Sequence, residues 1–229
     1  MSVINKYVDK IFVINLPHRT DRAKLIDEQL KKYNITNYEW FNAIYTNYAN
    51  IDAYMKQYNY RFYGGSYRCF PGTLGCLLSH VEVLKIARNR GYNRILILED
   101  DAVFQDDFEE KMISVIKDTM NVDYDMLYLG ANYMAPSIPV TNNLRKVQVA
   151  YTTHAYIIPK KLFNEVIDTA VNHGKQIDIF YVDCIQSRGN CYGVNPNIIS
   201  QSGLSSDVIT YLTGDVTTCS TYFPELKEQ

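Results

Sequence analysis

The chain has 229 residues, of which 47% are hydrophobic and 21% charged, with a formal net charge of -2. This length can bury one substantial core but is short for two complete domains, so we predict a single domain over residues 1–229. A nearly neutral chain has no overall field to attract nucleic acid or an anionic membrane, which excludes proteins that bind these partners through net positive charge.

The first part of the chain is predicted to fold as strand, helix and strand. Residues 11–16 form a short apolar run rich in β-branched side chains, typical of a strand buried on both faces of a sheet. After Pro17, apolar residues recur at helical spacing from Ala23 to Tyr33, which predicts a helix. Residues 38–44 are predicted to form a second strand, and the tyrosine-rich residues 45–70 to form a mobile loop or short helices.

Another buried strand, followed by acidic residues, is predicted near the middle of the chain. Thr73 is expected to cap a helix that Gly91 closes, and residues 95–98 are a second fully buried strand. Asp107 and Glu110 have the spacing of a capping box, which indicates that another helix begins there.

The remainder continues the alternation of strands and helices. This pattern implies right-handed crossovers and a mainly parallel α/β sheet, Rossmann-related, with helices on both faces. The predicted elements are strands at residues 126–129, 151–158 and 192–194, and helices at residues 160–171 and 178–186.

Three adjacent carboxylates, Glu99, Asp100 and Asp101, directly follow the buried strand. In an open parallel sheet, ligands bind beyond the carboxyl ends of the strands. Neighbouring carboxylates repel one another, and a divalent cation such as Mg²⁺ or Mn²⁺ would satisfy them and stay open to phosphate oxygens. The alternative is a solvated acidic turn that caps the next helix.

The cysteine pattern bears on the compartment and on other metal sites. The five cysteines form no CxxC pair and show no zinc-like spacing with the four histidines, so neither a metal knuckle nor a disulfide framework is indicated. No transmembrane segment is predicted, and the run at residues 11–16 is too short for a signal-peptide core. Reduced thiols and a cytoplasmic location are therefore expected.

Four segments in this order resemble glycosyltransferase family 25, which includes lipooligosaccharide and procollagen galactosyltransferases. They are residues 13–16 with Arg19 and Arg22, Gly75-Cys76 with Ser79-His80, residues 97–101, and residues 153–156 followed by Pro196 and Gln201. The resemblance implies a GT-A-like fold, a UDP-sugar donor, and transfer with inversion that gives a β-glycoside.

The same resemblance suggests roles for the acidic residues and the first turn. The triplet stands where other GT-A enzymes carry a metal motif, so Asp101 is the first metal ligand expected. Glu99 is expected to contact the metal or the ribose, and Asp100 to belong to the same donor site. The segment with Asn15, Arg19 and Arg22 stands where the family binds the nucleotide, and their planar donors suit uracil edges and phosphate oxygens. The alternative is that both arginines decorate a helix surface.

Two histidines and a serine are further candidates. His80 is grouped with the catalytic candidates, with orientation of the donor or bracing of the acidic strand end as its expected task. Ser79 and His154 are expected beside the donor, where His154 would contact the diphosphate or the metal. The alternative for each histidine is a satisfied, half-buried side chain, and Cys76 is interpreted as a small buried hydrophobe.

Direct displacement also needs a base for the acceptor proton. Asp178 matches the family pattern better and Asp183 is the reserve, while the alternative for Asp178 is an ordinary helix N-cap. Gln201 with Ser202, and Ser205, Ser206 and Asp207, resemble closing elements that would fold over the diphosphate.

The predicted activity is therefore a Mn²⁺- or Mg²⁺-dependent hexosyl transfer from UDP-galactose or UDP-glucose. The acceptor hydroxyl is left open between a glycan, a lipooligosaccharide and a hydroxylysine-type residue. The alternative function is a non-catalytic nucleotide-sugar or glycan-binding protein of the same fold. A metal-dependent phosphohydrolase would also place acids after a strand, but it would release inorganic phosphate.

Overall fold

The computed structural model describes residues 1–61, 70–136, 138–204 and 207–210, which alternate between strands and helices. The strands are β1 (Lys10–Asn15), β2 (Tyr38–Asn42), β3 (Arg94–Glu99), β4 (Ala102–Phe104), β5 (Met126–Tyr133), β6 (Ile138–Pro139), β7 (Leu144–Lys146), β8 (Ala150–Pro159), β9 (Cys191–Val194) and β10 (Ile199–Gln201). The helices are α1 (Ile4–Tyr7), α2 (Thr20–Lys32), α3 (Ile51–Gln57), α4 (Phe70–Asn89), α5 (Phe108–Thr119), α6 (Phe163–His173), α7 (Ile177–Phe180) and α8 (Asp207–Thr210), with shorter helical turns at Lys160–Leu162, Tyr181–Ile185 and Gln186–Arg188.

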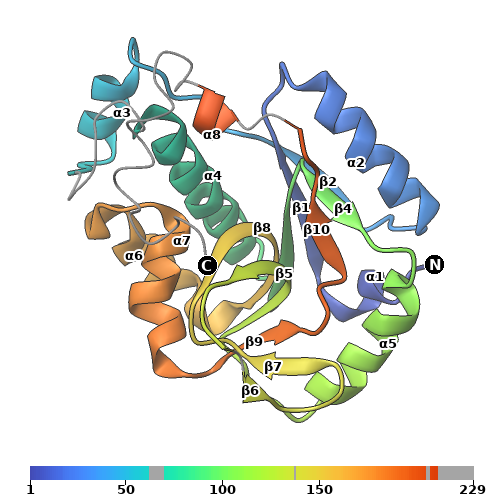
Figure 1. The fold of residues 1–229 in the computed structure, drawn as a ribbon. Helices are drawn as coiled ribbons and strands as arrows, with labels where there is room; N and C mark the ends of the chain where they lie inside the picture. Colours follow the sequence, from blue (N-terminus) through green and yellow to red (C-terminus); the bar gives the residue numbers. More distant parts are fainter. Residues whose placement is uncertain (62–69, 137, 205–206, 211–229) are drawn as a thin grey trace.

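The centre of the fold is an eight-stranded sheet with the order β2-β1-β3-β8-β5-β9-β7-β6 (Figure 1). β1 pairs in parallel with both β2 and β3, and β9 pairs in parallel with β5. β8 lies between β3 and β5 and is antiparallel to both. The strands β2, β1, β3, β5 and β9 therefore point the same way. The predicted α/β class, with a mainly parallel sheet, is confirmed.

Helices cover both faces of this sheet (Figure 1). Successive side chains of a strand point to opposite faces, so Phe12 and Ile14 pack with α4, α6 and α7, whereas Ile11 and Val13 pack with α1, α2 and α5. Both faces of these strands thus lie against hydrophobic side chains, which explains why the strands have continuous hydrophobic runs rather than alternating ones.

Two predicted helix starts need correction. α4 begins at Phe70 and contains Thr73, so Thr73 is not its cap. Pro71 explains the earlier start, because its fixed φ suits the first helical turn. α5 does begin after Asp107, but that side chain makes no capping hydrogen bond. Its carboxylate instead lies 2.9 Å from Lys111 Nζ, one turn further along the helix.

A small antiparallel ribbon, made of β4 and β10, lies outside the main sheet. It pairs Gln201 with Ala102, so the end of the described chain returns to the residues that follow β3. Gly130 allows β10 to approach the sheet, because a Cβ at this position would collide with the Ile199 carbonyl oxygen. Within the described residues, no helix has both the length and the apolar character needed to cross a membrane.

Candidate active site

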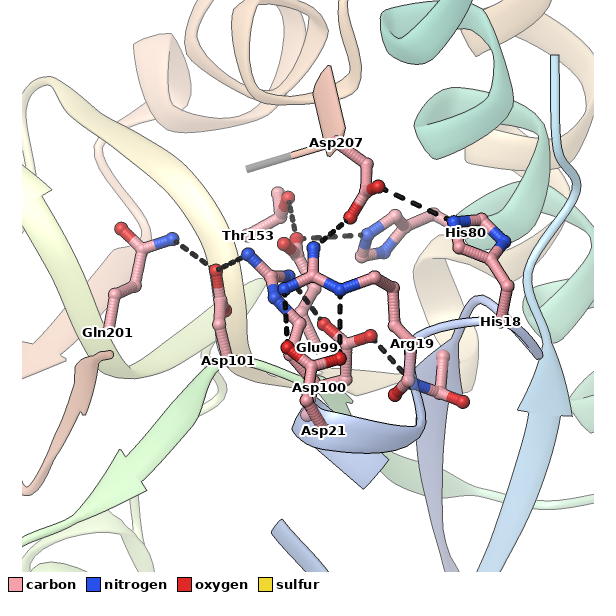
Figure 2. A network of polar contacts seen from close by, with 12 residues as sticks. His18, Arg19, Asp21, His80, Glu99, Asp100, Asp101, Thr153, Gln201 and Asp207 are labelled. Atoms are coloured by element: carbon pink, nitrogen blue, oxygen red, sulfur yellow. Dashed lines mark hydrogen bonds and ion pairs between the residues drawn. The ribbon is translucent and has the colours of Figure 1, made fainter. Parts of the chain in front are cut away.

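Polar side chains from four segments meet at the carboxyl ends of β1 and β3 (Figure 2). Glu99 is the last residue of β3, and Asp100 and Asp101 form the turn before β4. Asn15 ends the neighbouring strand, which pairs in register with β3 through Ile14 and Glu99. The predicted acidic cluster is thus assembled at a strand-end position where α/β sheets bind ligands.

Asp100 is bound within the protein. Its carboxylate accepts hydrogen bonds from Asn15 Nδ2 at 2.7 Å and from Arg22 Nη1 at 2.6 Å. Burial raises the pKa of Asp100, although the Arg22 guanidinium opposes that rise. Arg22 is itself only 6% exposed. This pair therefore joins α2 to the ends of β1 and β3 and gives Arg22 a structural partner.

Asp101 has one carboxylate oxygen with partners and one without. Oδ2 accepts a hydrogen bond from Gln201 Nε2 at 3.4 Å and lies 3.6 Å from Arg22 Nη2. Oδ1 is buried and has no hydrogen-bond partner among the described residues. Burial, followed by the negative charge of Glu99, raises the pKa of Asp101 to about 7. A divalent cation would satisfy such an oxygen, so the residues present fit the metal that the family resemblance implies.

Glu99 points to the opposite side, toward α4. Its Oε1 accepts a hydrogen bond from Thr153 Oγ1 at 2.6 Å and lies 3.3 Å from His80 Nε2. Burial alone would raise the pKa of Glu99, but the contacts with His80 and Thr153 outweigh it and hold the pKa below its usual value. His80 Nδ1 lies 2.9 Å from the hydroxyl of Tyr156. His80 therefore contacts both Glu99 at the acidic strand end and Tyr156 of β8, and the role expected of it stays a prediction.

A third group of side chains lies near Glu99. Donor atoms of Cys76, His80 and Glu99 all lie within 4.8 Å of one another. Cations could thus be held in two places: at Asp101, by oxygen atoms, and at this triad, by sulfur, nitrogen and oxygen.

The turn before α2 carries two basic side chains. The Arg19 guanidinium donates to both carboxylate oxygens of Asp21, at 3.0 and 2.9 Å, and also pairs with Asp207. His18 Nε2 lies 3.5 Å from the other Asp207 oxygen. Asp207 begins α8, so the C-terminal part of the described chain is joined to this turn (Figure 2). Ser205 and Ser206 lie outside the described residues.

His154 and Ser79 are held by hydrogen bonds within the protein, mostly with backbone groups. His154 Nε2 lies 3.2 Å from the Ile199 carbonyl oxygen and Nδ1 lies 3.1 Å from Thr152 Oγ1, while burial lowers its pKa and keeps the ring neutral. Ser79 Oγ accepts the Ile44 N–H at 2.8 Å and donates to the Gly75 carbonyl at 2.7 Å. Both side chains fix segments beside the site, and their predicted contacts with the donor stay predictions.

The two aspartates considered as bases lie in different surroundings. Asp178 is half-buried in the first turn of α7, and its carboxylate accepts the N–H groups of Ile179 at 2.8 Å and Thr152 at 3.4 Å. Burial raises its pKa, and the charge of Glu99 adds to this rise. The N-cap of α7 is Gln176, so the cap interpretation of Asp178 is wrong. Asp183 is instead paired with Lys175 at 2.7 Å and with His173 at 3.3 Å, so its ion pairs among the described residues do not involve the acidic cluster.

The sequence patterns did not indicate several of these contacts. Thr153 and Asp207 belong to motifs that resemble the family, but no partner was predicted for either. Tyr181 was not predicted to be near the site, although its hydroxyl lies 3.0 Å from that of Tyr156. Nothing in the sequence around a buried tyrosine indicates which side chain it will contact. Thr152 has φ 72°, unusual for a β-branched residue, at an irregular part of the β5–β8 pairing.

Comparisons with known proteins bear on this arrangement. A family model described as glycosyltransferase family 25 (LPS biosynthesis protein) matches residues 8–184. The putative glycosyltransferase R655 of Acanthamoeba polyphaga mimivirus is 32% identical over 147 residues, 63% of this chain and 44% of that protein. Human procollagen galactosyltransferase 2 is 29% identical over 174 residues, 69% of this chain and 28% of that protein. The chain thus spans less than half the length of either relative. A solved glycosyltransferase involved in glycosylation of the PBCV-1 major capsid aligns over 90% of this chain and 97% of its own, with a TM-score of 0.48 and 10% identity.

Proposed function

The chain belongs to glycosyltransferase family 25, and on this basis we propose that it transfers galactose or glucose from a UDP-sugar to a hydroxyl acceptor with inversion. The observation that carries the proposal is Asp101, whose buried Oδ1 lacks a partner among the described residues. It lies at the carboxyl end of the sheet, where a donor would bind. The product is a β-glycoside and UDP.

Asp101 would hold Mn²⁺ or Mg²⁺, with Glu99 as a further ligand or as a contact to the ribose. When bound, the ion supplies positive charge that stabilises the negative charge developing on the leaving diphosphate. In the reaction, the bond from the anomeric carbon to the β-phosphate oxygen breaks while the acceptor oxygen bonds to that carbon from the opposite face.

Arg19 and His18 would bind the phosphates of the donor. Support comes from the carboxylate of Asp207, which lies against both side chains and shows that an anion fits between them. A guanidinium fork suits phosphate for the same reason that it suits carboxylate. Asn15 and Arg22 would act mainly through Asp100, which they hold in place beside the nucleotide.

Asp178 would accept the proton of the acceptor hydroxyl. Its raised pKa suits a base that must be ionised and still take up a proton during transfer. The negative charge of Glu99 contributes to this rise, which supports a position for Asp178 near the acidic cluster.

The function is tested by release of UDP from UDP-galactose or UDP-glucose in the presence of Mn²⁺. A panel of hydroxylysine peptide, lipooligosaccharide and simple glycan acceptors would identify the acceptor class. Accelerated UDP release with one acceptor, and no inorganic phosphate, supports transfer. Tight UDP-sugar binding with no release in any condition would identify the non-catalytic alternative.

A pH dependence of metal binding follows from Asp101, whose pKa is raised to about 7 by burial and by Glu99. The carboxylate must be ionised to hold a cation, and its ionised fraction rises from ~10% at pH 6 to ~90% at pH 8, so we expect the Mn²⁺ affinity to rise roughly tenfold. The ordinary pKa of an aspartate side chain is 3.8, so the folded protein binds this proton more tightly than the unfolded chain does. The metal-free folded protein therefore loses stability as the pH rises from that value through about 7. Calorimetric titration with Mn²⁺ at both pH values would measure this, and equal affinities would contradict it.

The basic turn gives a second prediction. Arg19→Ala should weaken UDP binding by ~1–3 kcal/mol, because a charged hydrogen bond to phosphate is lost. Arg22→Ala is the comparison, since it leaves Asp100 without its buried partner and should cost stability, roughly 3–5 kcal/mol, more than affinity. Nucleotide titration and thermal melting of both variants separate the effects. Unchanged UDP affinity in Arg19→Ala would contradict this prediction and favour the alternative that Arg19 only decorates the helix surface.

A further inference from the structure

We propose that Cys76, His80 and Glu99 form a second cation site, selective for Zn²⁺ or a similar borderline-soft divalent ion, beside the oxygen site at Asp101. Cys76 and His80 are one helical turn apart on α4 and therefore share a face, which turns toward the end of β3. Their donor atoms and a carboxylate oxygen of Glu99 lie within 4.8 Å of one another.

The separations suit a common ion. His80 Nε2 and Glu99 Oε1 are 3.3 Å apart. Two ligands bound at ~2.0–2.1 Å to one tetrahedral zinc ion lie about 3.3 Å from each other, so this pair needs little adjustment. The Cys76 sulfur lies within 4.8 Å of both atoms, and three protein ligands leave a fourth position for water.

The surroundings of His80 fit a metal ligand. A ligating histidine usually binds a partner through its other ring nitrogen, which fixes the ring and its tautomer. Here Nδ1 lies 2.9 Å from the Tyr156 hydroxyl, which lies 3.0 Å from that of Tyr181. In the metal-bound state the proton would stay on Nδ1, where the Tyr156 hydroxyl can accept it, and the lone pair of Nε2 would bind the ion beside Glu99.

Chemistry separates this site from the one at Asp101. A thiolate and an imidazole favour zinc over magnesium or manganese, whereas carboxylate oxygens alone favour the harder ions. Cys76 and Glu99 are partly exposed, with 24% of the Glu99 side chain accessible, so an ion can enter from solvent. Because Glu99 belongs to both surroundings, occupancy of the triad would also change the donor site.

Co²⁺ is a suitable probe, because its bond to a thiolate gives a sulfur-to-cobalt charge-transfer absorption. We expect the protein to show this band at one equivalent of Co²⁺ and Zn²⁺ to bleach it. Cys76→Ser should abolish the band, His80→Asn should weaken Co²⁺ binding by at least tenfold, and Cys184→Ser and Cys191→Ser should leave both unchanged. A Cys69→Ser/Cys219→Ser double variant provides the same control for the two cysteines outside the described residues.

Asp101→Asn distinguishes this proposal from the proposed function. It should keep the cobalt–thiolate band although it loses Mn²⁺-dependent UDP binding. If the Cys76→Ser variant does not fold, Cys76→Ala replaces it in this test, with its melting temperature as the check that it is folded. The second site is refuted if wild-type protein shows no charge-transfer band, or if the band survives in both folded Cys76 variants.

Discussion

Asp101→Asn is expected to remove the enhancement of UDP binding by Mn²⁺ while the protein stays folded. The substitution keeps the size of the side chain and its contact with Gln201 but removes the charge that a hard cation requires. Removing a residue that contacts only a metal ligand typically lowers the metal affinity roughly 10–100-fold. Loss of a residue that binds the metal directly should lower it at least as much. Nucleotide titration with and without Mn²⁺ measures the effect.

The matched control is Asp106→Asn. Asp106 also follows β3 in the chain, but its carboxylate is exposed and pairs with Lys32. This variant should leave the Mn²⁺ effect intact. Glu99→Gln should reduce the effect less than Asp101→Asn does. Equal UDP affinity with and without metal in the wild-type protein would defeat the metal assignment, and complete loss in Glu99→Gln alone would reverse the order of the two carboxylates.

Local sequence patterns were sufficient for the strand ends that carry the site. The apolar runs behind β1 and β3 could be read because both strands are buried on two faces, and such strands lack polar interruptions. Once these strands were known, the parallel arrangement placed Asn15 next to the acidic turn. The position of the site thus depended on few long-range assumptions.

The partners inside the site could not be predicted in the same way. Gln201 reaches Asp101 only because β10 returns to pair with β4, and that approach depends on the absence of a side chain at Gly130. Asp207 lies 188 positions from its partner Arg19. No periodicity in one segment specifies which distant side chain will meet it.

The structure changes the interpretation of Arg22. The family resemblance predicted a position beside the nucleotide, and the structure puts the side chain at the carboxyl ends of β1 and β3, against Asp100. Its guanidinium is nevertheless buried against Asp100, an expensive arrangement that persists only when the charges are well paired. The pairing could not be inferred from the helix pattern, because exposed and buried arginines have the same spacing.

Asp178→Asn is expected to lower turnover by ~10²–10⁴-fold while Mn²⁺ and UDP-sugar affinities stay close to those of the wild-type protein. A base acts only while the acceptor proton is being removed, so its loss leaves donor binding unaffected. Ile179 and Thr152 donate to different oxygens of the carboxylate, at 2.8 and 3.4 Å, so the amide oxygen can keep the shorter bond while the longer, weaker one is lost. The melting temperature should therefore fall only modestly. Single-turnover transfer, compared with donor titration on the same variant, measures this separation.

Asp183→Asn is the natural control, because that aspartate lies in the next helical turn but pairs with Lys175 and His173 at a partly exposed position. This variant should lose no more than ~1 kcal/mol of unfolding free energy and should keep the wild-type transfer rate. If Asp183→Asn alone separates binding from turnover, the base is Asp183 and the raised pKa of Asp178 reflects burial without a catalytic use. If neither variant does, the proton acceptor lies outside this helical segment, and Glu99, a partly exposed carboxylate of the acidic cluster, becomes the next residue to test.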